Sequence, residues 1–176
     1  MKPHVYVIPF LALTVLAGCF MSTEPRIETG AALGEGPVAF CMPDEQPCQI
    51  GQPEGDGYLV KAEEEDEEDV RLRFEPLTEA DGATIYLGES ELRDDEDVAW
   101  SYIVARADGE TPEGLMRFTI MMPGCSDMDA EQRERFKIEK ADSYTCMVDD
   151  IANFRAYLIE AYTEHFADPA WWTDEN

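Results

Sequence analysis

Apolar and polar residues alternate along the middle of the chain with the period of a β-strand. Three segments show this alternation, at 70–75, 98–107 and 116–122. Such a pattern predicts strands that each bury one face. Shorter apolar runs predict three further strands, at 38–41, 58–62 and 83–88. Because the connections are short and contain Gly and Asp, sequential strands are expected to pair as an antiparallel meander of about five or six strands.

The period changes in the C-terminal third of the chain. Apolar and aromatic residues recur there at spacings of three and four: Ile151, Phe154, Leu158, Ala161, Tyr162 and His165. This spacing predicts an amphipathic helix at 150–166 that packs on one face of the sheet, with His165 as a packing residue on its buried edge. A shorter helix is predicted at 129–137, where Ser126 and Asp129 resemble a capping box. The predicted fold class is α+β.

A different pattern opens the chain. A single basic residue, Lys2, precedes an apolar run at 5–17 that ends in small residues. This arrangement predicts a secretory signal peptide. The run is shorter than the roughly 18 residues needed to cross a bilayer as a helix.

The four residues Leu16-Ala17-Gly18-Cys19 resemble the lipobox of bacterial lipoproteins. The resemblance covers only residues 1–19. It implies cleavage before Cys19, attachment of a lipid to the Cys19 sulfur and acylation of the new amine, for instance with palmitate. Several acyl chains anchor a protein stably in a membrane. Phe20 stands where an Asp retains enteric lipoproteins in the inner membrane, so the resemblance favours the periplasmic face of the outer membrane.

Three regions follow from these patterns. Residues 1–18 are predicted to be the signal peptide, and residues 37–176 a single disulfide-stabilised globular domain. Between them, the lipidated Cys19 and a polar segment with several glycines form a predicted flexible tether at 19–36. Seventeen flexible residues have an r.m.s. span of about 20–25 Å. A tether of that length would hold the domain away from the membrane.

Four cysteines remain in the mature chain besides Cys19. An even number in an oxidising compartment predicts two disulfides. We expect Cys41–Cys48 and Cys125–Cys146, because each pair closes a short local loop. A metal site is the alternative, but no C-x-x-C spacing occurs and His165 is the one histidine of the mature chain. No metal ligand is therefore assigned, and no cofactor is indicated.

The chain is strongly acidic, with 39 Asp and Glu against 13 Lys and Arg and a net charge of −26. Removal of residues 1–18, which hold Lys2 and no acid, leaves 12 basic residues and a net charge of −27. Such a field repels nucleic acid and anionic lipid headgroups, so nucleic-acid binding is excluded. Two acidic runs, at 63–69 and 94–97, could bind calcium, but adjacent like charges more often form solvated loops.

Motifs for known catalytic chemistry are absent from the sequence. It has no G-x-S-x-G, H-E-x-x-H, G-x-G-x-x-G or P-loop pattern. Among so many acids, no carboxylate pair can be singled out. The adjacent residues Trp171 and Trp172 are expected to cover the core, with an exposed docking patch as the alternative. The sequence thus assigns no catalytic residue.

The interpretation that follows is a membrane-anchored envelope lipoprotein with a non-catalytic binding or assembly role. Its partners are the membrane, through the lipid, and a protein of the envelope. Three alternatives stay open: a pocket for a small ligand lined by Trp100, Tyr102 and Phe118, an envelope enzyme that uses carboxylates, and a module tuned by calcium. The sequence leaves the oligomeric state open.

Overall fold

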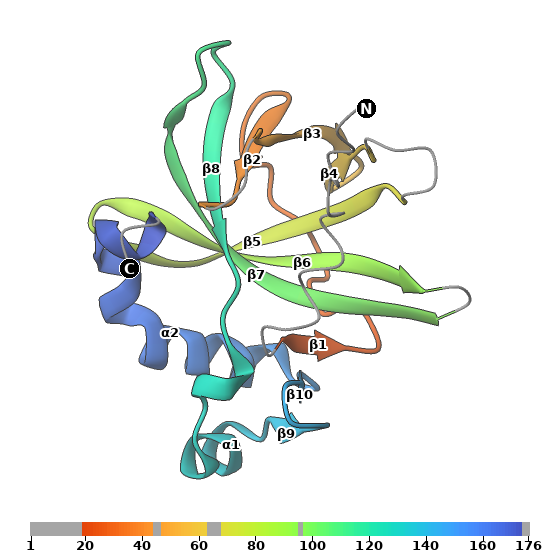
Figure 1. The fold of residues 1–176 in the computed structure, drawn as a ribbon, viewed down its shortest axis with the longest axis vertical. Helices are drawn as coiled ribbons and strands as arrows, with labels where there is room; N and C mark the ends of the chain where they lie inside the picture. Colours follow the sequence, from red (N-terminus) through yellow and green to blue (C-terminus); the bar gives the residue numbers. More distant parts are fainter. Residues whose placement is uncertain (1–18, 44–46, 63–67, 95–96, 174–176) are drawn as a thin grey trace, which may run out of the picture.

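A computed structural model describes residues 19–43, 47–62, 68–94 and 97–173. Its main feature is a closed barrel of seven strands (Figure 1). The strands are β2 (Val38–Cys41), β3 (Gln49–Glu54), β4 (Gly57–Val60), β5 (Val70–Ala80), β6 (Ala83–Asp94), β7 (Asp97–Glu110) and β8 (Met116–Met121). They pair in the order β6-β5-β4-β3-β2-β8-β7, and pairing of β6 with β7 closes the ring.

The predicted α+β class is confirmed, but the architecture is not a simple meander. Most neighbours along the chain do pair antiparallel, as expected. The closure, however, depends on a parallel pair, in which Val38 of β2 lies opposite Met116 of β8. The strand predicted at 38–41 therefore lies inside a continuous sheet, with β3 on one side and β8 on the other.

Three short strands extend the sheet beyond the barrel. These are β1 (Phe20–Ser22), β9 (Glu139–Lys140) and β10 (Cys146–Met147). β1 pairs antiparallel with β7 and parallel with β10, and β10 pairs antiparallel with β9. In Figure 1 these strands lie below the barrel, on the same side as the helices.

Two α-helices follow the barrel, and both predicted helices are confirmed. α1 (Ala130–Phe136) begins with a capping box between Asp129 and Gln132, rather than one that includes Ser126. α2 (Ile151–Ala167) is capped by Asp150, whose carboxylate accepts the backbone N–H groups of Ala152 and Asn153. Two short 3₁₀ turns, η1 (Cys125–Asp127) and η2 (Pro169–Trp172), complete the fold.

The barrel wall separates two hydrophobic clusters, because successive strand residues face opposite sides. On β7, Ile103 and Ala105 point into the barrel, whereas Tyr102 and Val104 point out. The inner cluster comprises Leu33, Val38, Phe40, Tyr58, Val60, Leu72, Phe74, Ile103, Ala105, Phe118 and Ile120. Rings of Phe40 on β2 and Phe74 on β5, which are not neighbours in the sheet, stack at 5.4 Å across the interior. Side chains therefore fill the barrel.

The outer cluster lies between the barrel and the helices. It comprises Phe20, Ile27, Leu77, Ile85, Leu87, Tyr102, Val104, Cys125, Met128, Phe136, Ile138, Cys146, Val148, Phe154, Tyr157, Leu158, Tyr162, Phe166 and Trp172. Phe154 of α2 contacts Phe20 and Tyr102, with ring centroids 4.8 and 5.0 Å apart. As predicted, α2 packs on one face of the sheet and the tryptophan pair covers the core.

His165 is not on the buried edge of α2, where its spacing predicted it. Its side chain is exposed, and its ring centroid lies 5.7 Å from that of Tyr162 and 5.6 Å from that of Trp171. Phe166, the next residue, occupies the buried position instead and is fully enclosed. His165 was placed on the apolar stripe because it lies three residues after Tyr162. In the structure the buried residue is Phe166, which lies four residues after Tyr162.

The predicted tether at 19–36 is wrong, because much of this segment is packed against the barrel. Phe20 and Ile27 are fully buried in the outer cluster, and Leu33 is buried in the inner cluster. The backbone N–H of Ala31 donates to the carbonyl of Phe74 at 2.6 Å, and the N–H of Leu33 donates to the Tyr58 hydroxyl at 2.9 Å. Packing against the barrel therefore extends to β1, directly after Cys19.

Candidate functional site

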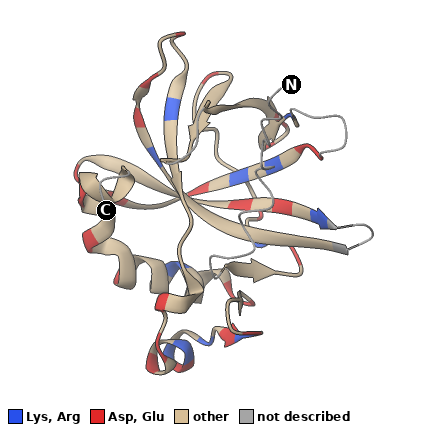
Figure 2. Ribbon diagram, in the orientation of Figure 1, with Lys and Arg blue, Asp and Glu red and all other residues tan. Residues whose placement is uncertain are grey.

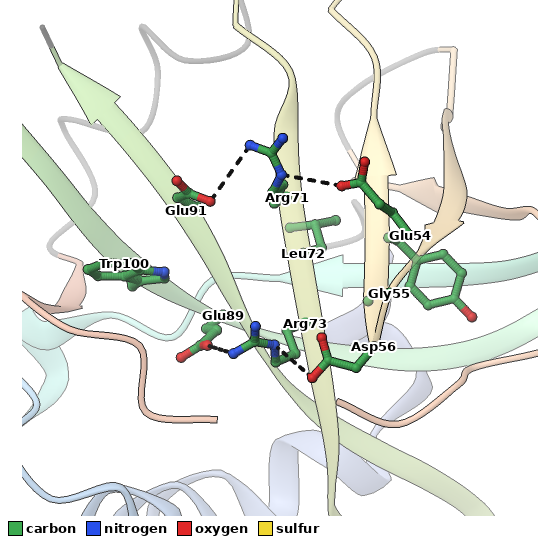
Figure 3. A pocket seen from close by; sticks show the side chains of 11 residues that line it. Glu54, Gly55, Asp56, Arg71, Leu72, Arg73, Glu89, Glu91 and Trp100 are labelled. Carbon is green, nitrogen blue, oxygen red and sulfur yellow. Dashed lines mark hydrogen bonds and ion pairs between the residues drawn. The ribbon is translucent and has the colours of Figure 1, made fainter. Parts of the chain in front are cut away.

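A groove of about 260 Å³ lies on the outer surface of the barrel, and we call it the outer groove. The turn between β3 and β4 forms one side, β5 forms the floor, and β6 with β7 forms the other side (Figure 3). Its lining residues are Glu54, Gly55, Asp56, Gly57, Tyr58, Arg71, Leu72, Arg73, Glu89, Glu91 and Trp100. Four carboxylates thus face two guanidinium groups and one indole.

Two arginines on β5 organise the outer groove. Leu72 and Phe74 point into the barrel, so the alternating positions of Arg71 and Arg73 point out. Each arginine lies between an acid of the β3–β4 hairpin, Glu54 or Asp56, and an acid of β6 (Figure 3). In Figure 2, acidic and basic positions lie close together along the right-hand halves of β5 and β6.

The first group of ion pairs in the groove is centred on Arg71. Its Nε lies 3.3 Å from Glu54 Oε2, and its Nη1 lies 3.9 Å from Glu91 Oε2. The Arg71 and Glu54 side chains are half-exposed, whereas Glu91 is largely buried and also contacts Arg93. Because solvent screens such pairs, each stabilises the fold by about 1 kcal/mol or less. These groups can therefore exchange partners with a ligand at low cost.

The second group of ion pairs is centred on Arg73, and its side chains are more enclosed by the protein. Arg73 Nε lies 3.3 Å from Asp56 Oδ2, and Arg73 Nη1 lies 3.4 Å from Glu89 Oε1. Arg73 Nη1 also donates to the carbonyl of Ile27 at 2.7 Å. The N–H of Gly30 donates to Asp56 Oδ2 at 3.0 Å, and this bond, with help from Arg73, lowers the pKa of Asp56. The ion pairs and hydrogen bonds around Arg73 thus join the groove to segment 26–30.

Glu89 is the most buried acid of the groove, at 2 % exposure. Its Oε2 accepts the backbone N–H groups of Arg26 at 2.8 Å and Ile27 at 3.1 Å. Burial raises the pKa of Glu89, and the two N–H donors and Arg73 oppose that rise. A buried acid with a raised pKa is a usual candidate for a general acid. Here, however, Oε2 holds the N-terminal segment on the barrel and Oε1 pairs with Arg73, which is a structural role.

Close approach of the backbone shapes the turn beside the groove. Gly55 has a φ of +61°, which favours glycine. A Cβ on Gly57 would lie 2.3 Å from the carbonyl oxygen of Leu72, so a side chain there would push β4 away from β5. Substitution at either glycine would displace Glu54 and Asp56. The turn therefore sets the width of the groove.

The structure does not bring Trp100, Tyr102 and Phe118 together around one cavity. Trp100 lines the outer groove, Tyr102 lies in the outer cluster and Phe118 in the inner cluster. The Tyr102 hydroxyl lies 2.8 Å from Ser22 Oγ, and burial raises the Tyr102 pKa to about 12. Tyr102 thus holds β1 to β7 rather than facing a ligand.

Both predicted disulfides are confirmed. Cys41 is bonded to Cys48, and Cys125 to Cys146. The first bond tethers β2 to the segment that enters β3. The second connects η1 to β10 inside the outer cluster. Cys19, the predicted lipidation site, is partly buried at the start of β1, and burial raises the pKa of its thiol.

Two other predictions concern residues that are only partly described. The signal peptide at 1–18 lies outside the described residues, and so do residues 63–67 and 95–96 of the two acidic runs. Within the described part of the chain, no group of three or more His, Cys, Asp and Glu side chains is arranged to hold a metal ion. No helix there has both the length and the apolar composition needed to cross a membrane.

Sequence reasoning missed Arg71, Arg73, Glu89 and Glu91 as a set. The signal that points to them is charge at alternate positions, with arginines at 71 and 73 and glutamates at 89 and 91. On paired strands such residues share one face and form cross-strand ion pairs. Arg73 indeed lies opposite Glu89 in the register of β5 and β6.

No protein-family model, no curated protein and no solved structure matches this chain. The outer groove therefore has to be interpreted from its own chemistry. It offers half-exposed carboxylates and guanidinium groups beside an indole, and its most buried acid is committed to holding the N-terminal segment. This arrangement suits reversible polar binding better than acid–base catalysis.

Proposed function

We propose that this chain is a lipid-anchored protein of the bacterial cell envelope, with a non-catalytic binding or assembly role. Cleavage before Cys19 and acylation of that residue would fasten the domain outside the cytoplasm, on the periplasmic face of the outer membrane. The observation that carries the proposal is the lipobox-like sequence Leu16-Ala17-Gly18-Cys19 at the end of an apolar run.

Two features of the domain support this location. The four other cysteines form two disulfides, which persist in oxidising compartments such as the periplasm. Cys19 also lies directly before β1, whose Phe20 is fully buried, so a chain that begins at Cys19 keeps every residue of the described domain. Both features agree with processing at this position.

Substitution of Cys19 tests the anchor. In the native bacterium, Cys19→Ser should abolish incorporation of labelled palmitate and move the protein from the membrane fraction to the soluble periplasmic fraction, or leave it uncleaved. Thr23→Ser, at an exposed position four residues later, is the matched control and should behave like the wild type. Unchanged membrane retention of Cys19→Ser would refute the anchor.

The outer groove supports the binding role. Its lining holds four acids and two arginines, a formal charge of −2. The half-exposed side chains among them can accept or donate further hydrogen bonds. A partner that presents both charges, such as a polar face of an envelope protein, fits this surface. We propose no catalytic residue, because Glu89 is committed to Arg26, Ile27 and Arg73.

Charge reversal tests the groove as the binding surface. Chemical crosslinking in intact cells should yield an adduct with the wild-type protein that Arg71→Glu loses. Lys61→Glu is the control, because Lys61 is exposed, forms its ion pair with Asp69 and does not line the groove. Loss of the adduct in both variants, or in neither, would rule out the groove as the contact.

A further inference from the structure

The attachment point and the folded domain are separated by no spacer. Phe20 follows Cys19 directly and is fully buried in the outer cluster. The carbonyl of Cys19 itself accepts the N–H of Cys146 at 3.0 Å. β1 lies between β7 and β10, and Cys146 is covalently joined to Cys125. A membrane anchor at Cys19 would thus hold the domain against the bilayer surface, in one orientation.

The surface beside Cys19 is the turn between β9 and β10. In the parallel register of β1 and β10, Phe20 lies opposite Cys146. One step back along both strands, Cys19 lies beside Thr145, and Tyr144 comes next. Tyr144 is 60 % exposed, the most exposed of the large hydrophobic side chains in the described part of the chain.

The turn holds Tyr144 in a defined position. The Asp142 carboxylate accepts the N–H groups of Tyr144 at 2.7 Å and Thr145 at 2.8 Å. These bonds also lower the pKa of Asp142, so the carboxylate stays ionised and keeps accepting them at neutral pH. The N–H of Ala141 closes the turn by donating to the Thr145 carbonyl at 2.9 Å. An exposed aromatic ring on an ordered turn costs little conformational entropy when it binds.

The segment that includes β9 and this turn differs in charge from the chain as a whole. Residues 137–145 hold two lysines, Lys137 and Lys140, and two acids, Glu139 and Asp142, so their formal charge is zero in a chain of −26. All four side chains are exposed. A neutral patch with lysines is a part of this acidic surface that anionic headgroups do not repel.

We propose that the β9–β10 turn, with Tyr144 at its centre, rests in the headgroup region of the bilayer to which Cys19 is anchored. This inference rests on the proposed lipidation of Cys19. Tyrosine is enriched at membrane–water interfaces, where its ring contacts acyl chains and its hydroxyl stays hydrated. Figure 1 places β9 and β10 at the lower end of the molecule and β2, β3 and the β7–β8 turn at the upper end, so the barrel projects away from the membrane.

Photocrosslinking to lipid tests this orientation. The full chain is processed in cells with benzoylphenylalanine in place of Tyr144 and, as the control, in place of Ile50. Ile50 is an apolar residue at 39 % exposure on β3, a strand that lies toward the upper end of the molecule in Figure 1. The lipidated proteins are reconstituted in vesicles of phosphatidylethanolamine and phosphatidylglycerol, irradiated and analysed by mass spectrometry. We expect about tenfold more phospholipid adduct at position 144 than at position 50.

A third protein distinguishes a defined orientation from random collisions with the membrane. A flexible Gly/Ser insert of about sixteen residues between Cys19 and Phe20 has an r.m.s. span of about 20–24 Å. With this insert, the adduct at position 144 should fall to the level seen at position 50.

The outcomes separate this inference from the proposed function. Lipid on Cys19 with equal adducts at 144 and 50 would overturn the orientation and leave the anchor intact. Lipid on Cys19 with an adduct at 144 that survives the insert would show that the turn reaches the bilayer by its own affinity, and would overturn the inference that the direct attachment sets the orientation. No lipid on Cys19 would overturn both.

Discussion

The inner and outer clusters lie on opposite sides of the same barrel wall, yet they are assembled from different spans of the chain. The inner cluster draws its buried residues from Leu33 to Ile120, nearly all on strands. The outer cluster joins Phe20 at one end of the described chain to Trp172 at the other. The barrel interior is therefore a product of strand alternation, whereas the outer layer depends on contacts between distant segments. The proposed anchor, Cys19, belongs to this second region.

Removing one aromatic ring from each cluster should have the largest effect on stability and should show whether the two clusters unfold separately. Phe154→Ala in the outer cluster and Phe74→Ala in the inner cluster each remove a fully buried ring, and each should cost about 3–5 kcal/mol of unfolding free energy. Hydrogen exchange should then differ. Phe154→Ala should release amides of β1 and α2 while β5–β7 stay protected, whereas Phe74→Ala should weaken protection throughout. The same exchange pattern in both variants would mean that the clusters unfold as one unit.

The two disulfides give a second, smaller contrast. Replacing Cys125 and Cys146 by Ala opens a loop with a sequence separation of 21, and replacing Cys41 and Cys48 opens one of 7. The chain-entropy model predicts losses of about 3.4 and 2.5 kcal/mol, respectively. Urea unfolding of the two double variants measures both losses. A larger loss for the Cys41–Cys48 pair would contradict the view that the outer layer depends more on its crosslink.

The two groove arginines should differ in their effect on stability, because Arg73 contacts the packed N-terminal segment and Arg71 does not. Arg73→Gln leaves Glu89 buried without its cation and frees the Ile27 carbonyl, so we expect a loss of about 2 kcal/mol. Arg71→Gln breaks a half-exposed pair with Glu54 and a long contact of 3.9 Å with Glu91, and should cost less than about 1 kcal/mol. Thermal unfolding of both variants checks the order. Equal losses would show that Arg73 does not hold segment 26–27.

The titration of Glu89 should give the smallest effect. Its pKa is raised in the folded state by burial, so the folded protein binds the Glu89 proton more tightly than the unfolded chain. Stability from this group is therefore present at low pH and is lost as pH rises through the folded pKa. Relative to Glu89→Gln, the wild type should lose unfolding free energy as pH rises above the ordinary titration range of a glutamate. A relative gain over that range would mean that Arg73 and the N–H donors outweigh burial.

Much of the barrel could be predicted from the sequence, because alternation reports which face of a strand is buried. Alternation at 70–75 and 98–107 identified β5 and β7, and the 3.6 period identified α2. Barrel closure could not be predicted, since the pairing of Val38 with Met116 joins segments 78 residues apart. The tether prediction failed for a related reason. Phe20, Ile27 and Leu33 are single apolar residues in a polar stretch, and no local period shows that they are buried.

The candidate site was less accessible to sequence reasoning than the fold. With 39 acids, neither Glu89 nor Glu91 is distinguished by type, and only the register of β5 with β6 places them beside Arg71 and Arg73. Cysteine pairing was predictable because close spacing limits the loops that can form. The Tyr144 surface was not, because its meaning comes from the parallel pairing of β1 with β10.

Mass spectrometry of the N-terminal peptide from membrane-purified protein tests whether Cys19 carries the anchor. We expect a chain that begins at Cys19, with a lipid on its sulfur and an acyl group on its amine. A peptide that still contains Leu16-Ala17-Gly18, or a Cys19 with an unmodified thiol, would contradict the anchor and the membrane orientation inferred from it.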